Sequence, residues 1–509
     1  MPERGAKRCF VALSQGALHL RWQGEGPALV LLHQSPQNGR MWSGLMAELE
    51  SRYLVLAPDL PGFGFSAPLP EPSIRGFAEA VLEALSRLGI EQFLVFGMHT
   101  GGLVAAEMGR LAPQRVAAVL VDGYAWFDED ERQAFDERYL PAVEPRSDGG
   151  HLLWLWARMR EQRFFFPWYD GRAEAALALS APSAEANDAL VRDVLVAWDG
   201  YRAAYRAALL DRERDRILEL RVPTVLFYRD DDVLASHRAR LPPLPESVRA
   251  EGIADRKALI AALARELTEH ARERPAYRLA SLPARSDGIG LIATEAGSIA
   301  CRWQGPGPRF ELWLPCPVEG CPAPTPSDGS VLLIDWPGQG ASERGEALSR
   351  EVLLHALAAI EVIGPLCGIR AFGAAAPLAL EAAAVLSLPP PTLLRPWWLS
   401  SAERARLLAG LPDPRPHRAG GHLLEAWQWA RDSFLFPPWT EASAGDRLQV
   451  GAPAPHAVHE RFLRAFLPGP GFADLLSACL RPPPEDCRPG RVLEEHPALR
   501  GRDLREMEA

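Results

Sequence analysis

The chain has 509 residues, which is too long for one ordinary hydrophobic core and predicts two to four domains. Hydrophobic residues make up 48% of it and charged residues 24%, the proportions of a globular protein. A formal net charge of -10 argues against a nucleic-acid-binding protein, which carries a basic face. No apolar run has the length of a membrane span, and the first residues do not resemble a signal peptide. We therefore expect a cytoplasmic protein with neither nucleic acid nor membrane as a partner.

In the first part of the chain, short apolar runs alternate with segments of helical periodicity. The runs predict buried strands at 28–33, 53–58, 93–97 and 117–123. The periodic segments predict helices at 74–89 and 103–111. Strands and helices that alternate at this spacing predict an α/β fold, with a mostly parallel sheet and helices on both faces.

A second kind of pattern interrupts the sheet. Residues 124–220 have only helical patterns, rich in Trp, Phe and Arg, and predict a helical cap over the sheet. Strands resume at 222–232 and 247–253, and an amphipathic helix follows at 255–270, so the first domain is expected to span 1–270. The polar, proline-interrupted stretch 271–287 is predicted to be an interdomain linker.

Four segments of the first domain recur later in the same order. They are RWQGEGP (21–27, again at 302–308), DLPGFGFS (59–66, again at 335–342), FGMHTGGL (96–103, again at 372–379) and residues 149–168, which match 420–439 at ten of twenty positions. This period is far too long for a solenoid and predicts a tandem duplication. The second, degenerate domain would span 288–483 with a cap at about 400–455. A polar tail at 484–509, with no apolar strand, would follow.

The sequence Gly97-Met98-His99-Thr100-Gly101 joins the strand at 93–97 to the next helix through a tight turn. With the LLHQ loop at 31–34, this GxHTG turn resembles the α/β-hydrolase superfamily, over roughly 25–270 and again over 300–480. The resemblance implies two tandem α/β-hydrolase-like domains. It also implies an active site under the cap, where a sharp strand-to-helix turn presents the nucleophile beside oxyanion-binding N–H groups.

The resemblance assigns roles to individual residues. His99 stands at the nucleophile position, and the acid is Asp232 or, in the alternative position, Asp122. The backbone N–H groups of Thr100 and Gln34 would bind an oxyanion, with His33 in the same loop. Apart from the resemblance, the aromatic run in the cap predicts that Trp154 lines the substrate pocket. The usual base histidine is missing, because no histidine lies between His237 and His270.

Two functions remain open. His99 could act as a general base or an unusual nucleophile on a small apolar carbonyl compound, such as an ester, lactone or thioester. Alternatively, both domains are pseudoenzyme domains that bind or scaffold. The aromatic cap predicts a ligand that is apolar and uncharged at its buried end.

The remaining expectations concern the second domain and the partners. The second domain has Ala375 at the elbow and Pro377 in place of a glycine, so it is predicted to be inactive. His422 of the second domain corresponds to His151 of the first, and we interpret both histidines as structural. No metal or cofactor motif occurs. We expect the two domains to pack as in a fused dimer, and a homo-oligomer remains an alternative.

Overall fold

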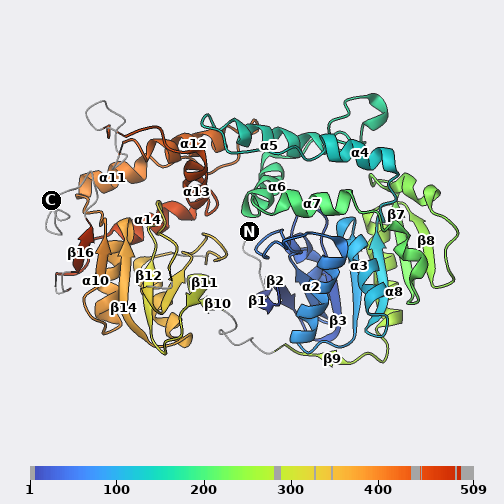
Figure 1. The fold of residues 1–509 in the computed structure, drawn as a ribbon, viewed down its shortest axis with the longest axis horizontal. Helices are drawn as coiled ribbons and strands as arrows, with labels where there is room; N and C mark the ends of the chain where they lie inside the picture. Colours follow the sequence, from blue (N-terminus) through green and yellow to red (C-terminus); the bar gives the residue numbers. More distant parts are fainter. Residues whose placement is uncertain are drawn as a thin grey trace. The chain divides into compact units, whose positions relative to one another are not determined.

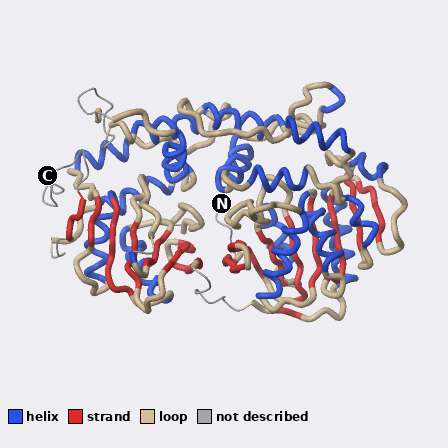
Figure 2. The backbone as a smooth tube through the Cα atoms, viewed as in Figure 1, coloured by secondary structure: helices blue, strands red, loops and turns tan. Residues whose placement is uncertain are grey.

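The computed structural model describes residues 6–279, 288–325, 328–345, 348–436, 447–448, 450–485, 487 and 490–494. The chain divides into two compact units. The first contains 3–143 and 157–282, and the second contains 144–156 and 283–509. Each unit holds one β-sheet flanked by helices (Figures 1 and 2). In the part of the chain that the structure describes, no helix combines the length and the apolar character needed to cross a bilayer.

The sheet of the first unit has the strand order β1-β2-β4-β3-β5-β6-β7-β8. The β1–β2 and β2–β4 pairs are antiparallel, and every later pair along this path is parallel. The strands are β1 (Lys7–Leu13), β2 (Gly16–Gln23), β3 (Gly26–Leu32), β4 (Leu54–Pro58), β5 (Phe93–Met98), β6 (Val116–Asp122), β7 (Thr224–Arg229) and β8 (Val248–Ile253). The carboxyl ends of β3, β5, β6 and β7 therefore meet at one edge of the sheet.

Helices cover both faces of this sheet, as the alternating pattern predicted. They are α1 (Ser43–Leu49), α2 (Ile74–Arg87), α3 (Thr100–Leu111) and α8 (Arg256–His270). Alternate strand residues such as Leu29, Leu31 and Phe96 share a core with α1 and α8, whereas α2 and α3 pack together against the sheet. Strands β5 and β6 are buried from end to end and β3 is buried from Ala28 onward, which explains why their sequences are continuous apolar runs.

Four helices lie between β6 and β7, in the range expected for the cap. They are α4 (Glu129–Arg138), α5 (Gly150–Glu161), α6 (Ala184–Val196) and α7 (Tyr201–Leu209). Asp193 of α6 is buried and accepts hydrogen bonds from Asn38 Nδ2 (2.9 Å) and Arg40 Nη2 (2.8 Å). This contact holds the cap on the loop that follows β3.

The first unit extends further along the chain than the expected boundary at 270. Ala276 and Tyr277 form strand β9, which pairs with the start of β3. The Tyr277 hydroxyl also accepts hydrogen bonds from the backbone N–H groups of Glu91 and Gln92. The first part of the predicted linker is thus bound to the first sheet, and its residues 280–287 lie outside the described residues.

The sheet of the second unit has the order β10-β11-β13-β12-β14-β15-β16. Its strands are β10 (Ile289–Thr294), β11 (Gly297–Gln304), β12 (Phe310–Leu314), β13 (Val331–Ile334), β14 (Leu366–Phe372), β15 (Thr392–Leu394) and β16 (Arg491–Glu494). When the strands of each sheet are numbered along the chain, both sheets begin with the spatial order first, second, fourth, third, fifth and sixth. The last strand corrects the expectation of a strandless tail, because β16 pairs in parallel with β15. It is a short edge strand with charged residues at both ends, and such a strand needs no long apolar run.

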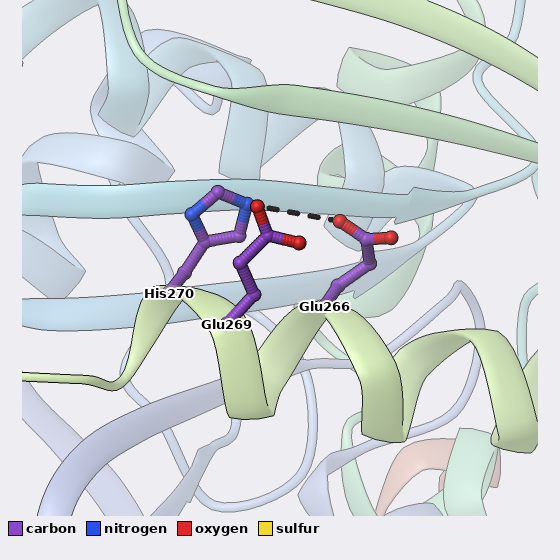
Figure 3. A group of neighbouring side chains, drawn as sticks. All are labelled: Glu266, Glu269 and His270. Carbon is purple, nitrogen blue, oxygen red and sulfur yellow. Dashed lines mark ion pairs between the residues drawn. The ribbon is translucent and has the colours of Figure 1, made fainter.

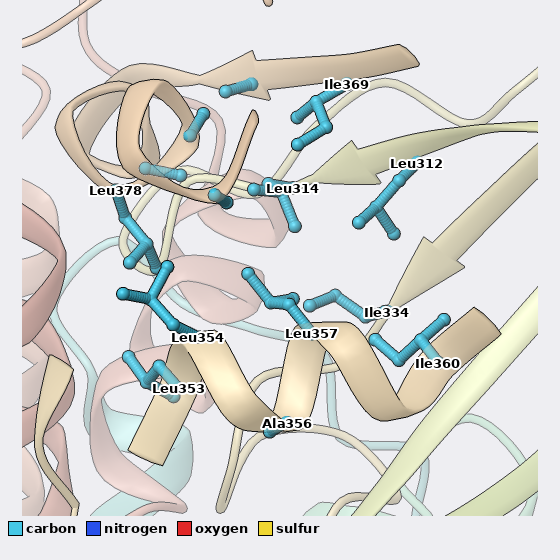
Figure 4. Close-up of a cluster of buried hydrophobic side chains, with 14 of the residues drawn as sticks. Leu312, Leu314, Ile334, Leu353, Leu354, Ala356, Leu357, Ile360, Ile369 and Leu378 are labelled. Carbon is cyan, nitrogen blue, oxygen red and sulfur yellow. The ribbon is translucent and has the colours of Figure 1, made fainter. Parts of the chain in front are cut away.

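Helices and sheet enclose the main core of the second unit (Figure 4). The helices are α9 (Arg350–Ala359), α10 (Ala376–Val385), α11 (Ser401–Ala409), α12 (Gly421–Asp432), α13 (Pro455–Phe466) and α14 (Gly471–Leu480). Leu312, Leu314 and Ile334 of the sheet pack with Leu353 and Leu357 of α9. Of the cap expected at about 400–455, residues 437–446 and 449 lie outside the described residues.

Segment 144–156 packs in the second unit through pairs of matching contacts. Trp156 Nε1 donates to Arg418 O (3.2 Å), and Trp427 Nε1 donates to Ser147 O (3.3 Å). The Trp156 ring lies edge-to-face against His422, and the Trp427 ring lies in the same way against His151. Each contact thus has a counterpart in which the residues of the two recurring segments exchange places.

Candidate active site

A strained strand-to-helix turn presents His99 at the edge where the parallel strands end. His99 has φ 46° and ψ -107°, and it forms the N-cap of α3 directly after β5. The turn needs glycines on both sides. A Cβ at Gly97 would lie 2.1 Å from Gly101 O, and one at Gly101 would lie 2.2 Å from Leu32 O. The sequence GMHTG therefore folds into the sharp elbow expected from it.

The His99 ring points toward Asp232, in the loop after β7. Its Nε2 atom lies 2.9 Å from Oδ1 and 3.1 Å from Oδ2 of the carboxylate. Gly123 leaves room for this contact, because a Cβ there would lie 2.7 Å from His99 Cδ2. The His99 side chain is 21% exposed and that of Asp232 is 7% exposed. Among the described residues, nothing accepts from or donates to Nδ1, so this nitrogen is the ring's chemically available atom.

Arg229 connects the two candidate acids. Its Nε atom donates to both oxygens of Asp122, at 3.1 and 3.2 Å, and its Nη2 atom donates to Asp232 Oδ2 at 2.9 Å. Leu234 N also donates to Asp232 Oδ1. The structure thus brings Asp232 to His99 and pairs Asp122 with arginine. Arg229 was missed in the sequence, and its only signal was a basic residue at the end of β7 beside three aspartates.

Opposing influences set the proton affinity of this group. Burial lowers the pKa of His99, but the charge and hydrogen bond of Asp232, with Asp122 behind it, raise it above the ordinary value overall. Burial raises the pKa of Asp232, yet the bond to His99 lowers it more, to about 2. The pKa of Asp122 is raised by its burial against the charge of Arg229. Asp232 is therefore a carboxylate at neutral pH, and His99 titrates above its ordinary range.

The loop after β3 lies against the elbow. Ser35 Oγ is 2.9 Å from Thr100 Oγ1, and the Gln34 side chain is bonded to Gln37. The described residues contain no acceptor for the backbone N–H groups of Gln34 or Thr100, which are the two oxyanion donors expected from the sequence. His33 is fully buried, with Nδ1 bonded to Gln34 O and Nε2 accepting from Leu60 N. Its side chain therefore supports the loop and does not reach the site.

Two further residues considered in the sequence analysis do not complete the site. Trp154 of α5 lies in segment 144–156, which groups with the second unit, so it is not placed with His99. His237 is buried, and its Nδ1 atom accepts a hydrogen bond from Trp126 N. Burial also lowers the pKa of His237 to about 4, so it remains neutral. It does not replace the missing base histidine.

Residues 27–242 match the family model described as alpha/beta hydrolase fold. Strands β4 to β7, nearly all of β3, the elbow after β5 and the acid after β7 lie in this range. The first unit therefore has the alpha/beta hydrolase fold, and we call it the hydrolase domain for its fold. Its sheet and flanking helices confirm the predicted fold class.

Individual relatives of this hydrolase domain match shorter stretches. A pimeloyl-[acyl-carrier protein] methyl ester esterase of Aeromonas hydrophila is 41% identical over 100 residues, 19% of this chain and 37% of the relative. A fluoroacetate dehalogenase of a Burkholderia species is 32% identical over 138 residues, 25% of this chain and 45% of the relative. The chain thus spans less than half the length of these curated relatives. The solved structure of Cfl2 from Burkholderia cenocepacia is 20% identical, with a TM-score of 0.39, over 53% of this chain and 97% of that one.

The second unit has an apolar turn where the hydrolase domain has its elbow. Gly373–Ala375 form a short 3-10 helix before α10, and all three residues are buried. A Cβ at Gly373 would lie 2.8 Å from Cys316 Sγ, so the turn is filled by packed atoms. Ala375 offers no proton-transfer group at this position.

At the end of α8 of the hydrolase domain lies a cluster of side chains of the types that can bind a metal ion. They are Glu266, Glu269 and His270 (Figure 3). Glu266 is buried and forms ion pairs with Arg249 (2.6 Å) and Arg265 (3.1 Å). These two guanidinium groups neutralise its carboxylate and oppose a cation. The cluster is accounted for as an ion-pair network between β8 and α8.

Proposed function

We propose that the first unit is an enzyme that acts on a small apolar carbonyl compound and uses His99 as its general base. The observation that carries the proposal is the contact of His99 Nε2 with Asp232 at 2.9 Å. A neutral imidazole that donates from Nε2 to a carboxylate keeps its lone pair on Nδ1. The elbow would then present a base where the superfamily presents a nucleophile.

A histidine base at this position could catalyse proton transfer. His99 Nδ1 would take a proton from a water molecule or from a carbon next to a carbonyl group, and Asp232 would stabilise the imidazolium that forms. The backbone N–H groups of Thr100 and Gln34 would donate to the carbonyl oxygen as negative charge develops on it. For an ester, lactone or thioester, attack by the activated water would yield the acid and the alcohol or thiol. Esterase and dehalogenase relatives support a hydrolytic reaction.

The alternative is a binding or scaffold protein without turnover. This alternative is favoured by the absence of a histidine directly after β8, where residues 254–257 are ADRK. It is also favoured by His33, because both of its ring nitrogens form hydrogen bonds within the protein and neither is available to a substrate. It is disfavoured by the elbow, which is costly to maintain. A non-glycine residue at positive φ, such as His99, stores about 1–3 kcal/mol of strain.

We also propose that the second unit descends from a duplication of the first and is catalytically inactive. The four recurring segments, the shared order of the first six strands and the exchanged contacts of Trp156 and Trp427 support this proposal. The alanine turn at 373–375 supports the absence of catalysis. The second unit would act as a structural partner.

One experiment tests the catalytic proposal. Wild type, His99→Ala and His99→Ser are compared on a panel of aryl and alkyl esters, lactones and thioesters at pH 8. We expect turnover by wild type, and a fall of about 10² or more in both variants, because a serine without a base histidine is not activated. Accumulation of a covalent acyl-enzyme on wild type would identify His99 as a nucleophile. Identical traces for all three proteins would leave the binding protein as the function.

A further inference from the structure

The helical cap of the first unit contains a buried arginine without a carboxylate partner. Arg158 of α5 is 2% exposed, and a guanidinium keeps its charge at any accessible pH. Its Nη1 atom donates to Gln162 Oε1 at 2.8 Å. Its Nε and Nη2 atoms are buried, and no acceptor among the described residues meets the distance and angle of a hydrogen bond to them.

The surroundings of this guanidinium are aromatic. It lies 5.3 Å from the ring centre of Tyr139 and 5.6 Å from that of Trp168. Burial holds the pKa of the neighbouring Tyr205 well above its ordinary value, while the charge of Arg158 and the approach of its guanidinium to the Tyr205 hydroxyl act against it. The phenol is therefore neutral, and aromatic faces supply only part of the stabilisation that a buried cation requires.

The two nitrogens without an acceptor point to the kind of ligand. Nε–H and Nη2–H lie on one edge of the guanidinium and are the pair that holds a carboxylate with two parallel hydrogen bonds. The same pair holds a carboxylate elsewhere in this chain. Arg110 donates to both oxygens of Glu107 at 3.0 and 2.6 Å, and Arg172 donates to those of Asp170 at 2.8 and 2.6 Å.

We propose that Arg158 anchors a carboxylate-binding site in the cap of the first unit, whose aromatic walls take an apolar or aromatic acid. Such a ligand would differ from the one expected from the sequence, which is uncharged at its buried end. The second recurring segment has Trp429 at the position of Arg158, so the charge is particular to the first. Two donors on one edge match the two oxygens of a carboxylate, whereas a phosphate dianion calls for more donors.

Calorimetric titration of the full chain tests the site, with benzoate as probe and benzamide as its neutral isostere. We expect benzoate to bind at least about tenfold more tightly than benzamide, because hydrogen bonds to a charged group are the stronger kind. Arg158→Met should weaken benzoate by about tenfold or more. Arg160→Met should not, since Arg160 lies on another side of α5, over the Phe164 ring.

Thermal unfolding of the variants distinguishes a loss of benzoate binding from a loss of folding. Arg158→Met removes a buried charge without a carboxylate partner, so its Tm should equal or exceed that of wild type, and benzoate should raise Tm only where Arg158 is present. Arg158→Lys keeps the charge but loses the two-donor edge, and we expect it to lose benzoate affinity while folded. Equal benzoate binding by wild type and Arg158→Met, no binding by wild type, or tighter binding of inorganic phosphate would each overturn the proposal.

The site does not depend on His99 being a base. His99→Ala should bind benzoate as wild type does, even if it turns over no ester. Loss of turnover with retained binding would therefore support both proposals. Absence of turnover in wild type with retained, Arg158-dependent binding would remove the enzyme proposal and keep this one.

Discussion

His99 Nε2 lies 2.9 Å from Asp232 Oδ1, so the residue at the nucleophile position is paired with the residue at the acid position. In the triad that the superfamily resemblance implies, a third residue, the base histidine, stands between these two positions. Here one imidazole occupies the elbow and reaches the acid by itself. The contact is possible because residue 123 is a glycine, whose missing Cβ would lie 2.7 Å from His99 Cδ2.

The Asp232→Asn variant tests this pairing. Burial, the largest influence on His99, lowers its pKa, and Asp232 is the main influence that raises it. We therefore expect the pKa of His99 to fall below its value in wild type when the carboxylate is removed. NMR titration of the imidazole measures this shift without any substrate. The Asp231→Asn variant is the matched control, because Asp231 is half exposed and contacts Arg229 but not His99.

The pH dependence of turnover follows from the same pair. A base acts in its deprotonated form, so activity of wild type should increase with pH through the raised pKa of His99. In Asp232→Asn this acid limb should move to lower pH, and the plateau should fall by about 10² or more because the imidazolium loses its counter-ion. A limb that stays in place in the variant would show that another group titrates.

The Gly123→Ala variant tests the room that the pair requires. Gly123 has φ +72°, and a Cβ there would meet both His99 Cδ2 and His99 Nε2 within 3 Å. We expect a destabilisation of about 1–3 kcal/mol, from strain and from the displaced ring. The His99→Ala change should recover part of this loss in the double variant, and urea unfolding of the four proteins measures it. Additive losses would mean that the two residues do not interact.

The glycines of the elbow provide a further comparison. Gly97→Ala would place a Cβ 2.1 Å from a backbone oxygen, so we expect a loss of several kcal/mol or no folded protein. Gly44→Ala is the control within the same unit. Gly44 lies in α1, and a Cβ there would have nothing within 4 Å, so we expect a gain of about 0.5–1 kcal/mol from helix propensity. Thermal unfolding distinguishes the two outcomes.

The sequence allowed the parallel strands to be predicted because both of their faces are buried. Leu29, Val30 and Leu31 are all fully buried, which leaves a continuous apolar run. Strands β1 and β2 were not predicted, since His19 and Arg21 interrupt the apolar pattern of β2. Both side chains are nevertheless buried, because each has Asp59 as a partner at 2.8 Å: His19 is hydrogen-bonded to its carboxylate, and Arg21 forms an ion pair with it. Pairing over this sequence distance has no local signal.

The same reason limited prediction of the site. His99 and Asp232 could be named from their places after β5 and β7, but their direct contact depends on how the strand ends meet. Arg229 and Arg158 were not recognised, since an arginine gains its role only from the groups around it. Arg229 lies among three carboxylates and Arg158 lies among aromatic rings, and neither arrangement follows from spacing along the chain.

The exchanged contacts of segment 144–156 in the second unit predict matched effects of mutation. Trp156→Ala and Trp427→Ala each remove a buried indole, a ring contact with a histidine and a hydrogen bond to a backbone oxygen. We expect each to cost about 3–5 kcal/mol. Hydrogen exchange should increase in 144–156 and 420–427 in both variants. Strongly unequal effects would argue that the two tryptophans do not occupy equivalent positions.

Buried histidines predict that the protein loses stability in mild acid. Burial lowers the pKa of His33 and of His151 to about 4, and that of His459 to about 3. In the unfolded chain these groups take up protons near pH 6.5, whereas in the folded chain they do so only near pH 4 and below. Between these values the unfolded state binds more protons, so stability is complete above about pH 6.5 and falls as pH decreases.

The contribution of one histidine to the slope of this loss can be measured. Each buried histidine contributes up to about 1.4 kcal/mol per pH unit between its two pKa values. His459→Phe keeps a ring beside Trp427 and Phe462 and removes one such group, so its stability should depend less steeply on pH. His355→Gln is the control, since His355 is 74% exposed. Urea unfolding at pH 7.5, 6.0 and 5.0 gives the slopes, and equal slopes for wild type and His459→Phe would contradict the assignment.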